Sequence, residues 1–96
     1  LEPEWDDDNI EHIARHGVTP EEVEEIVYED CHPSWIVRNR RRGVREARWM
    51  VFGQSCGGRY LLAVIAPYRR LGVWRAVTAR SMERQTQRRY RQWRRS

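Results

Sequence analysis

The chain of 96 residues is too short for two hydrophobic cores, and its five tryptophans among 40% hydrophobic residues exclude a wholly disordered protein. We therefore expect one domain over residues 1–96, with neither a signal peptide nor an apolar run of about 18 residues that could span a membrane. Residues 1–30 carry twelve acidic side chains and one arginine, whereas residues 31–96 carry two acidic side chains and seventeen arginines. Such a basic segment favours a surface that binds a polyanion, above all a nucleic acid.

The chain begins with the pattern of a short strand followed by a helix. Residues 1–5 predict a strand that Pro3 would confine to the edge of a sheet. Asp8 or Asn9 is expected to cap the helix, whose acidic first turn suits the helix dipole. The helix should stop at Gly17, and the side chains that it is expected to bury are Ile10, Ile13 and Ala14.

A second helix has a stronger start signal. Thr19 is a candidate N-cap, Pro20 fits the first helical position, and Glu22 completes a capping box with Thr19. The helix is expected to end within residues 30–33, because Pro33 cannot continue it. The expected buried stripe consists of Val23, Ile26 and Val27.

The pattern then changes to strands joined by short turns, which predicts an antiparallel meander. The predicted strands cover residues 35–37, 46–53, 59–66 and 73–79. The turns contain residues 40–43 and Cys56-Gly57-Gly58, and residues 67–72 connect the last two strands. Since the segment 60–66 is apolar on both faces, it should be a central strand.

The chain ends in a predicted amphipathic helix. Ser81 is the candidate cap, with Glu83 in the first turn. The apolar stripe consists of Met82, Thr86, Tyr90 and Trp93. We therefore predict an α+β fold with two N-terminal helices, a four-stranded antiparallel sheet (five-stranded if residues 1–5 join it) and a C-terminal helix.

Histidines and cysteines offer few sites for chemistry. His12 and His16 have a spacing that can chelate zinc from a helix, but the only further histidine, His32, lies beside Pro33, and solvated or hydrogen-bonded rings fit better. We therefore expect no metal site. Cys31 and Cys56 could form one disulfide, yet nothing else indicates secretion, so free thiols are the favoured interpretation.

The arginines are the main candidate for a binding surface. They follow one hairpin and the later strands, at positions that include Arg38, Arg40, Arg41, Arg42, Arg48 and Arg75. Few acidic residues are available nearby to pair with them, which favours contact with RNA phosphates over a merely solvated face. Trp35, Trp49 and Trp74 lie within apolar strands and are expected in the core instead of stacking on bases. A helix-turn-helix DNA reader is disfavoured, because the two front helices are acidic.

Short motifs occur along the chain in a characteristic order. They are Trp5-Asp6, Asn9-Ile10, His16-Gly17-Val18, Glu21-Glu22-Val23, Arg48-Trp49, Gly53-Gln54-Ser55, the run from Gly58 to Val64, the run from Arg75 to Arg80, and an arginine-rich helix with Tyr90. Over residues 5–91 the chain resembles the BrnT-type toxins of bacterial type II toxin–antitoxin systems.

The resemblance implies a RelE-like fold and a metal-independent endoribonuclease that needs no cofactor and blocks translation in the cytoplasm. It also implies a cognate antitoxin with a DNA-binding ribbon-helix-helix part, so that operator DNA is reached only through the antitoxin, and no membrane partner. Three features depart from the family pattern: Arg15 replaces a lysine, Thr86 stands where a glutamate is common, and the hairpin after residue 37, which usually contains acidic as well as basic residues, carries almost only arginine. Thr86 and the heavy arginine substitution motivate an alternative, a catalytically inactive module of the same fold that binds RNA or the antitoxin.

The implied reaction, in which a 2′-hydroxyl attacks the adjacent phosphate, suggests four catalytic candidates. Arg59 and Arg80 are expected to hold the scissile phosphate, since arginine stabilises charge without giving up its proton. His16 is the candidate acid or base, with stabilisation of a helix C-terminus as the alternative. Tyr90 could donate a proton or stack on a base, with packing of the last helix as the alternative.

Overall fold

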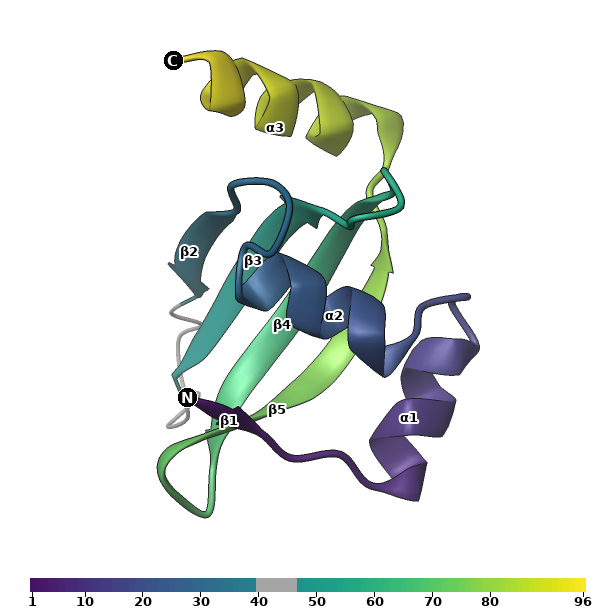
Figure 1. Cartoon of the computed structure of the whole chain (residues 1–96), viewed down its shortest axis with the longest axis vertical. Coiled ribbons are helices and arrows are strands. Elements are labelled where there is room, and N and C mark those ends of the chain that lie inside the picture. Colours follow the sequence, from purple (N-terminus) through teal and green to yellow (C-terminus); the bar gives the residue numbers. More distant parts are fainter. Residues whose placement is uncertain (40–46) are drawn as a thin grey trace.

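The computed structural model describes residues 1–39 and 47–96, which form three helices and five strands (Figure 1). In chain order the elements are β1 (Glu2–Pro3), α1 (Asp7–Ala14), α2 (Pro20–Val27), β2 (Trp35–Asn39), β3 (Arg48–Gln54), β4 (Tyr60–Tyr68), β5 (Arg70–Ser81) and α3 (Arg84–Arg95). The α+β class and the order of elements are confirmed. The predicted turn at residues 40–43 lies outside the described residues.

The strands form one sheet in the order β1-β5-β4-β3-β2. Strands β2 to β5 are the expected antiparallel meander, and β4 is its central strand. The prediction of a wholly antiparallel sheet is wrong at one edge, because β1 pairs with β5 in parallel, with Pro3 opposite Trp74. The two helices between β1 and β2 carry the chain away from this edge, so β1 is not bound by the hairpin connections that make the meander antiparallel.

The start of α2 is as predicted, whereas that of α1 differs. Thr19 and Glu22 form the capping box of α2. At α1 the cap is Asp6, not Asp8 or Asn9: Asp6 accepts a hydrogen bond from the Asn9 backbone N–H, and the Asn9 side chain accepts one from Asp6.

The inner face of α1 is also narrower than predicted. Asn9 and Ile13 are its buried residues, while Ile10 and Ala14 are exposed. The buried Asn9 side chain reaches the Glu4 carbonyl oxygen at 3.4 Å, so a polar group occupies part of the face expected to be apolar.

The C-terminal helix begins later than its predicted cap. Ser81 is the last residue of β5 and pairs with Leu61, so it extends the sheet instead of capping α3. Glu83 takes the N-cap position without a side-chain hydrogen bond.

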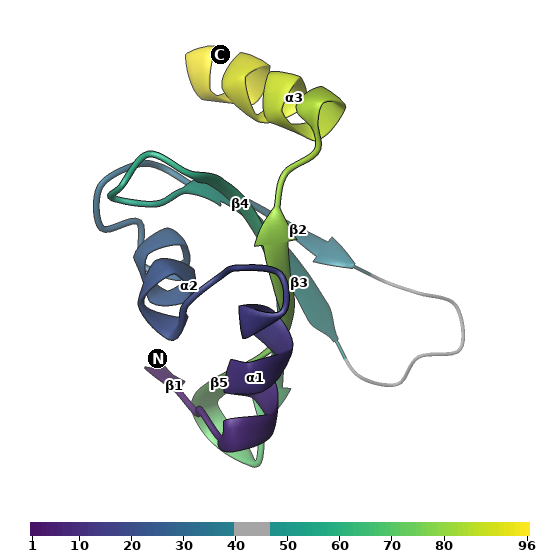
Figure 2. The same ribbon diagram turned by 90° about the vertical axis from the view of Figure 1, so that its right-hand side faces the viewer.

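Helices cover the two faces of the sheet unequally (Figures 1 and 2). α1 and α2 cover one face, whose core consists of Ile13, Val18, Val23, Ile26, Val51, Leu61, Ala63, Trp74, Ala76 and Ala79. α3 lies at one end of the molecule and closes a smaller cluster on the other face, made of Phe52, Leu62 and Tyr90 with Trp35, Met50, Tyr60, Met82 and Trp93 packed against it. Much of that second face therefore carries no helix formed by residues 1–39 and 47–96.

The tryptophans predicted to be in the core divide into two kinds. Trp74 is buried and Trp35 packs against the second cluster. Trp49 is only half-buried, and the Arg38 guanidinium carbon lies 5.7 Å from its ring centroid.

None of the helices in residues 1–39 and 47–96 is long and apolar enough to cross a membrane.

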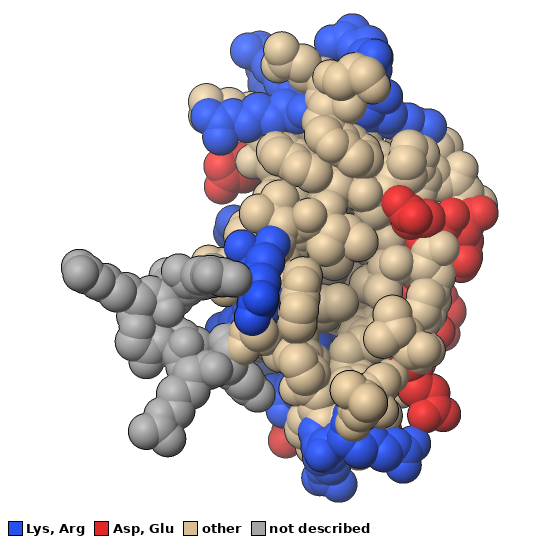
Figure 3. Space-filling model, turned by 90° about the vertical axis from the view of Figure 1, so that its left-hand side faces the viewer, with Lys and Arg blue, Asp and Glu red and all other residues tan. Residues whose placement is uncertain are grey.

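The charge division seen in the sequence becomes a division in space (Figure 3). Arginine side chains gather over α3 and over the hairpin between β4 and β5, while acidic side chains line the side that carries α2. On the side that this view shows, most acidic and most basic side chains therefore lie in different regions.

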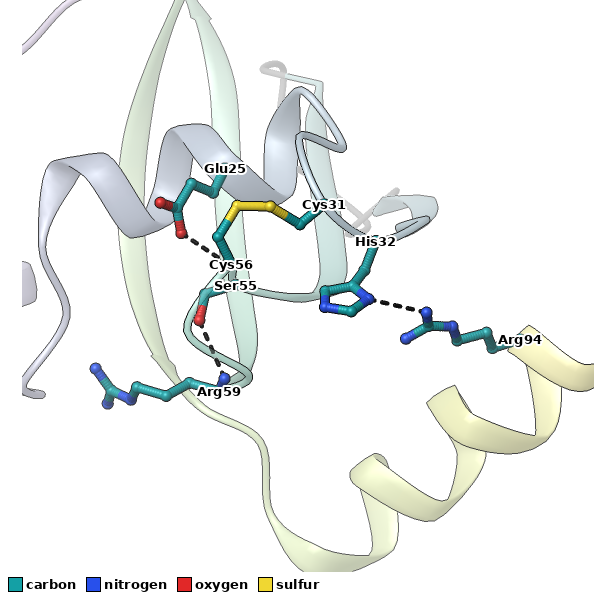
Figure 4. The surroundings of a disulfide bond; sticks show 7 residues. All are labelled: Glu25, Cys31, His32, Ser55, Cys56, Arg59 and Arg94. Atoms are coloured by element: carbon teal, nitrogen blue, oxygen red, sulfur yellow. Dashed lines mark hydrogen bonds between the residues drawn. A yellow bond between two sulfur atoms is a disulfide. The ribbon is translucent and has the colours of Figure 1, made fainter.

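Cys31 and Cys56 form a disulfide, so the prediction of free thiols is wrong (Figure 4). The bond joins the connection after α2 to the turn between β3 and β4, where the two Cα atoms are 5.2 Å apart. Glu25 of α2 accepts a hydrogen bond from the Cys56 backbone N–H at 3.0 Å, which holds the same turn against the helix. Both cysteines are exposed, so reductants can reach them.

Reduction of this disulfide should destabilise the fold. The bond closes a loop with a sequence separation of 25 residues, and the chain-entropy argument gives such a cross-link about 3.5 kcal/mol. We expect a phosphine reductant to lower the free energy of unfolding by about this amount in urea denaturation. The double variant Cys31→Ala/Cys56→Ala should match the reduced protein and be insensitive to the reductant. Equal stability of the oxidised and reduced forms would contradict the prediction.

Candidate functional site

An irregularity in β5 determines which side chains share the open face of the sheet. Arg75 and Arg80 are five residues apart, so in a regular strand they would point to opposite faces. The register shifts between the pairs Val64–Thr78 and Ile65–Ala76, which leaves Val77 as an extra residue. As a result Ala76 and Ala79 both enter the helix-covered core. Arg75, Thr78 and Arg80 therefore project from the other side of β5.

Helix α1 lies beside β5 (Figure 2), and the α1 segment carries two histidines, His12 and His16. His12 Nε2 lies 3.2 Å from Thr78 Oγ1. His16 lies just past the C-cap of α1, and its ring meets the His12 ring edge to face with centroids 5.7 Å apart. We call His12, His16, Arg75, Thr78 and Arg80 the α1–β5 site.

One end of this site is hollow. A pocket of about 300 Å³ opens between α1 and β5. Its lining consists of Asp6, Asp8, Asn9, His12, Arg75 and Val77. The pocket therefore brings an imidazole and a guanidinium together with two carboxylates, which is a chemically mixed surface.

At the other end of the site, the Arg59 side chain forms hydrogen bonds with both the α1–α2 connection and β5. Its Nη1 donates to the Gly17 carbonyl at 2.8 Å and to both carboxylate oxygens of Glu22 at 2.9 Å. Its Nη2 lies 3.3 Å from Ser81 Oγ. Since Gly17 follows His16 and Ser81 follows Arg80, these bonds hold the two flanking segments next to each other. The charge of Arg59 itself is already paired with Glu22.

Arg48 joins Arg75 on the open face. The pair Trp49–Ile65 places Arg48 opposite Ala66, and Ala66 in turn pairs with Arg75. Two arginines therefore flank a small buried residue, with Cα atoms two strands apart, about 10 Å.

Arg38, which was also predicted to bind RNA, lies on the other face of the sheet. Arg38 is opposite Trp49 in the β2–β3 ladder and shares its face, away from Arg48. Arg40, Arg41 and Arg42 lie outside the described residues. Arg80 is exposed, and none of the ion pairs formed within residues 1–39 and 47–96 includes it.

Tyr90 is placed in the packing role. The residue is fully buried, its hydroxyl donates to the Pro33 carbonyl, and its ring meets Tyr60 at 6.0 Å and Trp93 at 5.8 Å. Burial raises the pKa of Tyr90 above its ordinary value, and the nearby Arg94 offsets this only in part. The hydroxyl therefore stays protonated at neutral pH and is already committed to a carbonyl.

Two groups of the α1–β5 site were not predicted as functional. His12 was considered only as a metal ligand, and Thr78 was not considered. Their contact depends on how α1 lies along β5, and the helical spacing of His12 and His16 was the one available signal. No group of three or more histidine, cysteine or acidic side chains that could hold a metal ion occurs in the part of the chain that the structure describes.

The Tyr90 hydroxyl should contribute measurably to stability. Tyr90→Phe removes the hydrogen bond to the carbonyl of Pro33, an exposed residue, and we expect a loss of about 0.5–1.5 kcal/mol in the free energy of unfolding. Tyr60→Phe is the matched control, because the Tyr60 hydroxyl only accepts a surface hydrogen bond from Arg91. Urea denaturation of both variants measures the difference, and equal stability of Tyr90→Phe and the wild type would show that the hydroxyl is not needed for packing.

Comparison with known proteins adds one finding. A family model described as "Ribonuclease toxin, BrnT, of type II toxin-antitoxin system" matches residues 5–86. None of the curated proteins compared with the chain matches it. The matched range contains α1, α2 and β2 to β5, and with them every residue of the α1–β5 site.

Proposed function

Since the chain belongs to the BrnT family of ribonuclease toxins of type II toxin–antitoxin systems, we propose that it cleaves RNA at the α1–β5 site. The observation that carries this assignment is the bulge at Val77, which gives Arg75 and Arg80 one common face. Beside that face stands a pair of histidines, the side chains that most readily exchange protons near neutral pH. Cations and proton carriers are the two kinds of group that RNA cleavage without a metal requires.

Arg80 is the candidate for stabilising the transition state. Attack of the 2′-hydroxyl on phosphorus adds negative charge to the phosphate oxygens, and a fixed guanidinium can bind two of them at once. Arg80 is suited to this because it is exposed and stands near the end of a long strand.

His16 is the proposed acid. It lies just past the C-cap of α1, is exposed, and precedes the glycine whose carbonyl binds Arg59. As an imidazolium it protonates the 5′-oxygen that leaves phosphorus. Arg59 then has a positioning role, holding the turn that carries His16 against the end of β5.

The rest of the RNA is proposed to lie along the open face of the sheet. Arg48 and Arg75 supply positive charge there, and sequence-independent affinity for RNA comes mainly from such contacts with phosphates. The Tyr68 ring lies 5.3 Å from the guanidinium carbon of Arg75 and 4.8 Å from that of Arg69, so an aromatic face accompanies the charge.

The inactive alternative has no comparable support. It rested on Thr86 and on the arginine-rich hairpin. Thr86 lies in α3, and residues 40–46 of the hairpin lie outside the described residues, whereas the α1–β5 site is built from the α1 segment and β5. Neither departure therefore removes a group from the proposed site.

We further propose the partners and location that the family implies. A toxin of this class has an antitoxin, and the proposed one carries a ribbon-helix-helix part through which alone the complex contacts operator DNA. Cytoplasmic RNA is the proposed target, with inhibition of translation as the result. The RelE-like fold assignment is supported by the meander with two helices on one face and one helix at the end of the other.

Cleavage should not require a divalent metal. The proposed proton carrier and cation are protein side chains, so we expect RNA cleavage to continue at the same rate in EDTA. A gel assay with a labelled RNA, run with EDTA and with added Mg²⁺, measures this. Loss of cleavage in EDTA that Mg²⁺ or Zn²⁺ restores would overturn the metal-independent mechanism.

Arg80→Ala should act on rate more than on binding. Because Arg48 and Arg75 still bind the strand, we expect RNA affinity to stay within a few fold while kcat falls about 10²–10³-fold, the usual loss for one transition-state donor. Arg80→Lys should recover only part of the rate, since an ammonium lacks the bidentate fork.

Single-turnover cleavage and the melting temperature are measured on the same variants. Arg95→Ala, at the exposed end of α3, is the matched loss of one positive charge and should keep the wild-type rate. A lower melting temperature with an unchanged rate in Arg80→Ala would assign the residue to holding the fold.

A further inference from the structure

We propose that His12 is a second catalytic residue, which accepts the proton of the attacking 2′-hydroxyl. This inference rests on the proposed function and adds the base that His16 and Arg80 leave unassigned. It gives a role to both imidazoles, whose rings meet edge to face.

The position of His12 suits a substrate hydroxyl. Its Nε2 lies 3.2 Å from the Thr78 hydroxyl oxygen, so this nitrogen already has a neutral hydroxyl as its partner. A ribose 2′-hydroxyl that displaces the Thr78 hydroxyl from Nε2 can form the same kind of hydrogen bond, because both groups donate and accept. His12 is exposed, which leaves a path for the RNA.

The pocket beside His12 can receive the ribose and phosphate of one nucleotide. Its volume, about 300 Å³, lies at the lower end of the range for ligand sites, about 300–1,000 Å³. Arg75 lines it together with His12, so a phosphate near Arg75 brings its neighbouring sugar to the imidazole. This role needs Arg75 on the open face, where the bulge places it.

His12 and His16 can act on opposite sides of one phosphorus atom. His12 lies in α1 and His16 lies just past its C-cap, and their ring centroids are separated by 5.7 Å. The attacking and leaving oxygens of an in-line displacement lie on opposite sides of phosphorus. Two neighbouring proton carriers on different segments can therefore serve the two proton transfers.

The step balances with these residues alone. The 2′-oxygen forms a bond to phosphorus as its proton passes to Nε2 of neutral His12. The bond from phosphorus to the 5′-oxygen breaks, and the His16 imidazolium gives that oxygen a proton. The products are a 2′,3′-cyclic phosphate and a 5′-hydroxyl, and solvent returns both histidines to their starting protonation states.

The charged groups around His12 have opposite effects on the protonation of its imidazole ring. Asp6 and Asp8 contribute carboxylates to the pocket, while Arg75 and the facing His16 supply or can carry positive charge. Carboxylates favour a protonated imidazole, whereas cations favour a neutral one. A general base accepts a proton only in its neutral form, so the single-turnover rate should rise with pH if His12 is the base.

A structural role predicts a different result. In that case His12 merely attaches α1 to β5 through Thr78, and Thr78→Val should reproduce every effect of changing His12. Under the catalytic role, Thr78→Val removes only the resting partner of Nε2, and cleavage continues with the same pH profile.

The test is single-turnover cleavage of a labelled RNA in EDTA, from pH 5 to 8.5, with affinity measured on the same sequence carrying 2′-deoxyriboses. We expect His12→Gln to cleave about 10²–10⁴-fold more slowly, to bind within twofold of the wild type, and to lose the rise of rate with pH. His32→Gln is the matched control, because His32 contacts Arg94 of α3 and not β5. His12→Ala should recover part of its rate when free imidazole is added, a rescue that a structural role would not give.

The outcomes separate this inference from the proposed function. Wild-type protein that binds RNA and cleaves none overturns the proposed function, and the inference with it. Wild-type cleavage that His12→Gln matches in rate or pH profile overturns the role of His12 alone. If His12→Gln unfolds, the answer comes from His12→Ala with imidazole and from Thr78→Val, and absence of rescue together with an impaired Thr78→Val assigns His12 to structure.

Discussion

The register of β5 against β4 is the constraint on which the candidate site depends. One extra residue, Val77, changes which side chains of β5 enter the core. Ala76 and Ala79 can then both pack under α1 and α2, although their spacing of three does not fit a regular strand. The same shift places Arg75 and Arg80 on one face, and it presents Thr78 to His12. Packing of the core and assembly of the site are therefore consequences of a single irregularity.

Local signals predicted most of the fold. The start of α2 was predicted from Thr19, Pro20 and Glu22, and the central strand from the unbroken apolar run in β4. Both predictions succeeded because a helix cap and a burial pattern depend on residues that are close together in the sequence. The sequence did not identify Asp6 as the N-cap of α1, because several acidic residues occur at the start of that helix. The cap is identified only by the two hydrogen bonds that Asp6 exchanges with Asn9. The other errors concern groups distant in sequence.

The candidate site was predicted in part for the same reason. The sequence identifies candidate residues by their type, which here are the arginines and His16. Arg75 and Arg80 do lie in β5, and His16 follows α1. The partner of each was not visible: Arg59 is paired with Glu22, 37 residues earlier, and His12 meets Thr78, 66 residues later. The disulfide belongs to this group as well, because Cys31 and Cys56 meet only after α2 has docked on the sheet.

In the C-terminal helix, the region that matches the family ends before the last residues that pack on the sheet. The family match ends at residue 86, within the first turn of α3. Tyr90 and Trp93 lie beyond it, yet they complete the cluster around Phe52 and Leu62. A fragment cut at the end of the match would keep every strand and expose an aromatic and aliphatic patch on the sheet. The smallest fragment that keeps both cores intact therefore extends through Trp93, well past the boundary that the family defines.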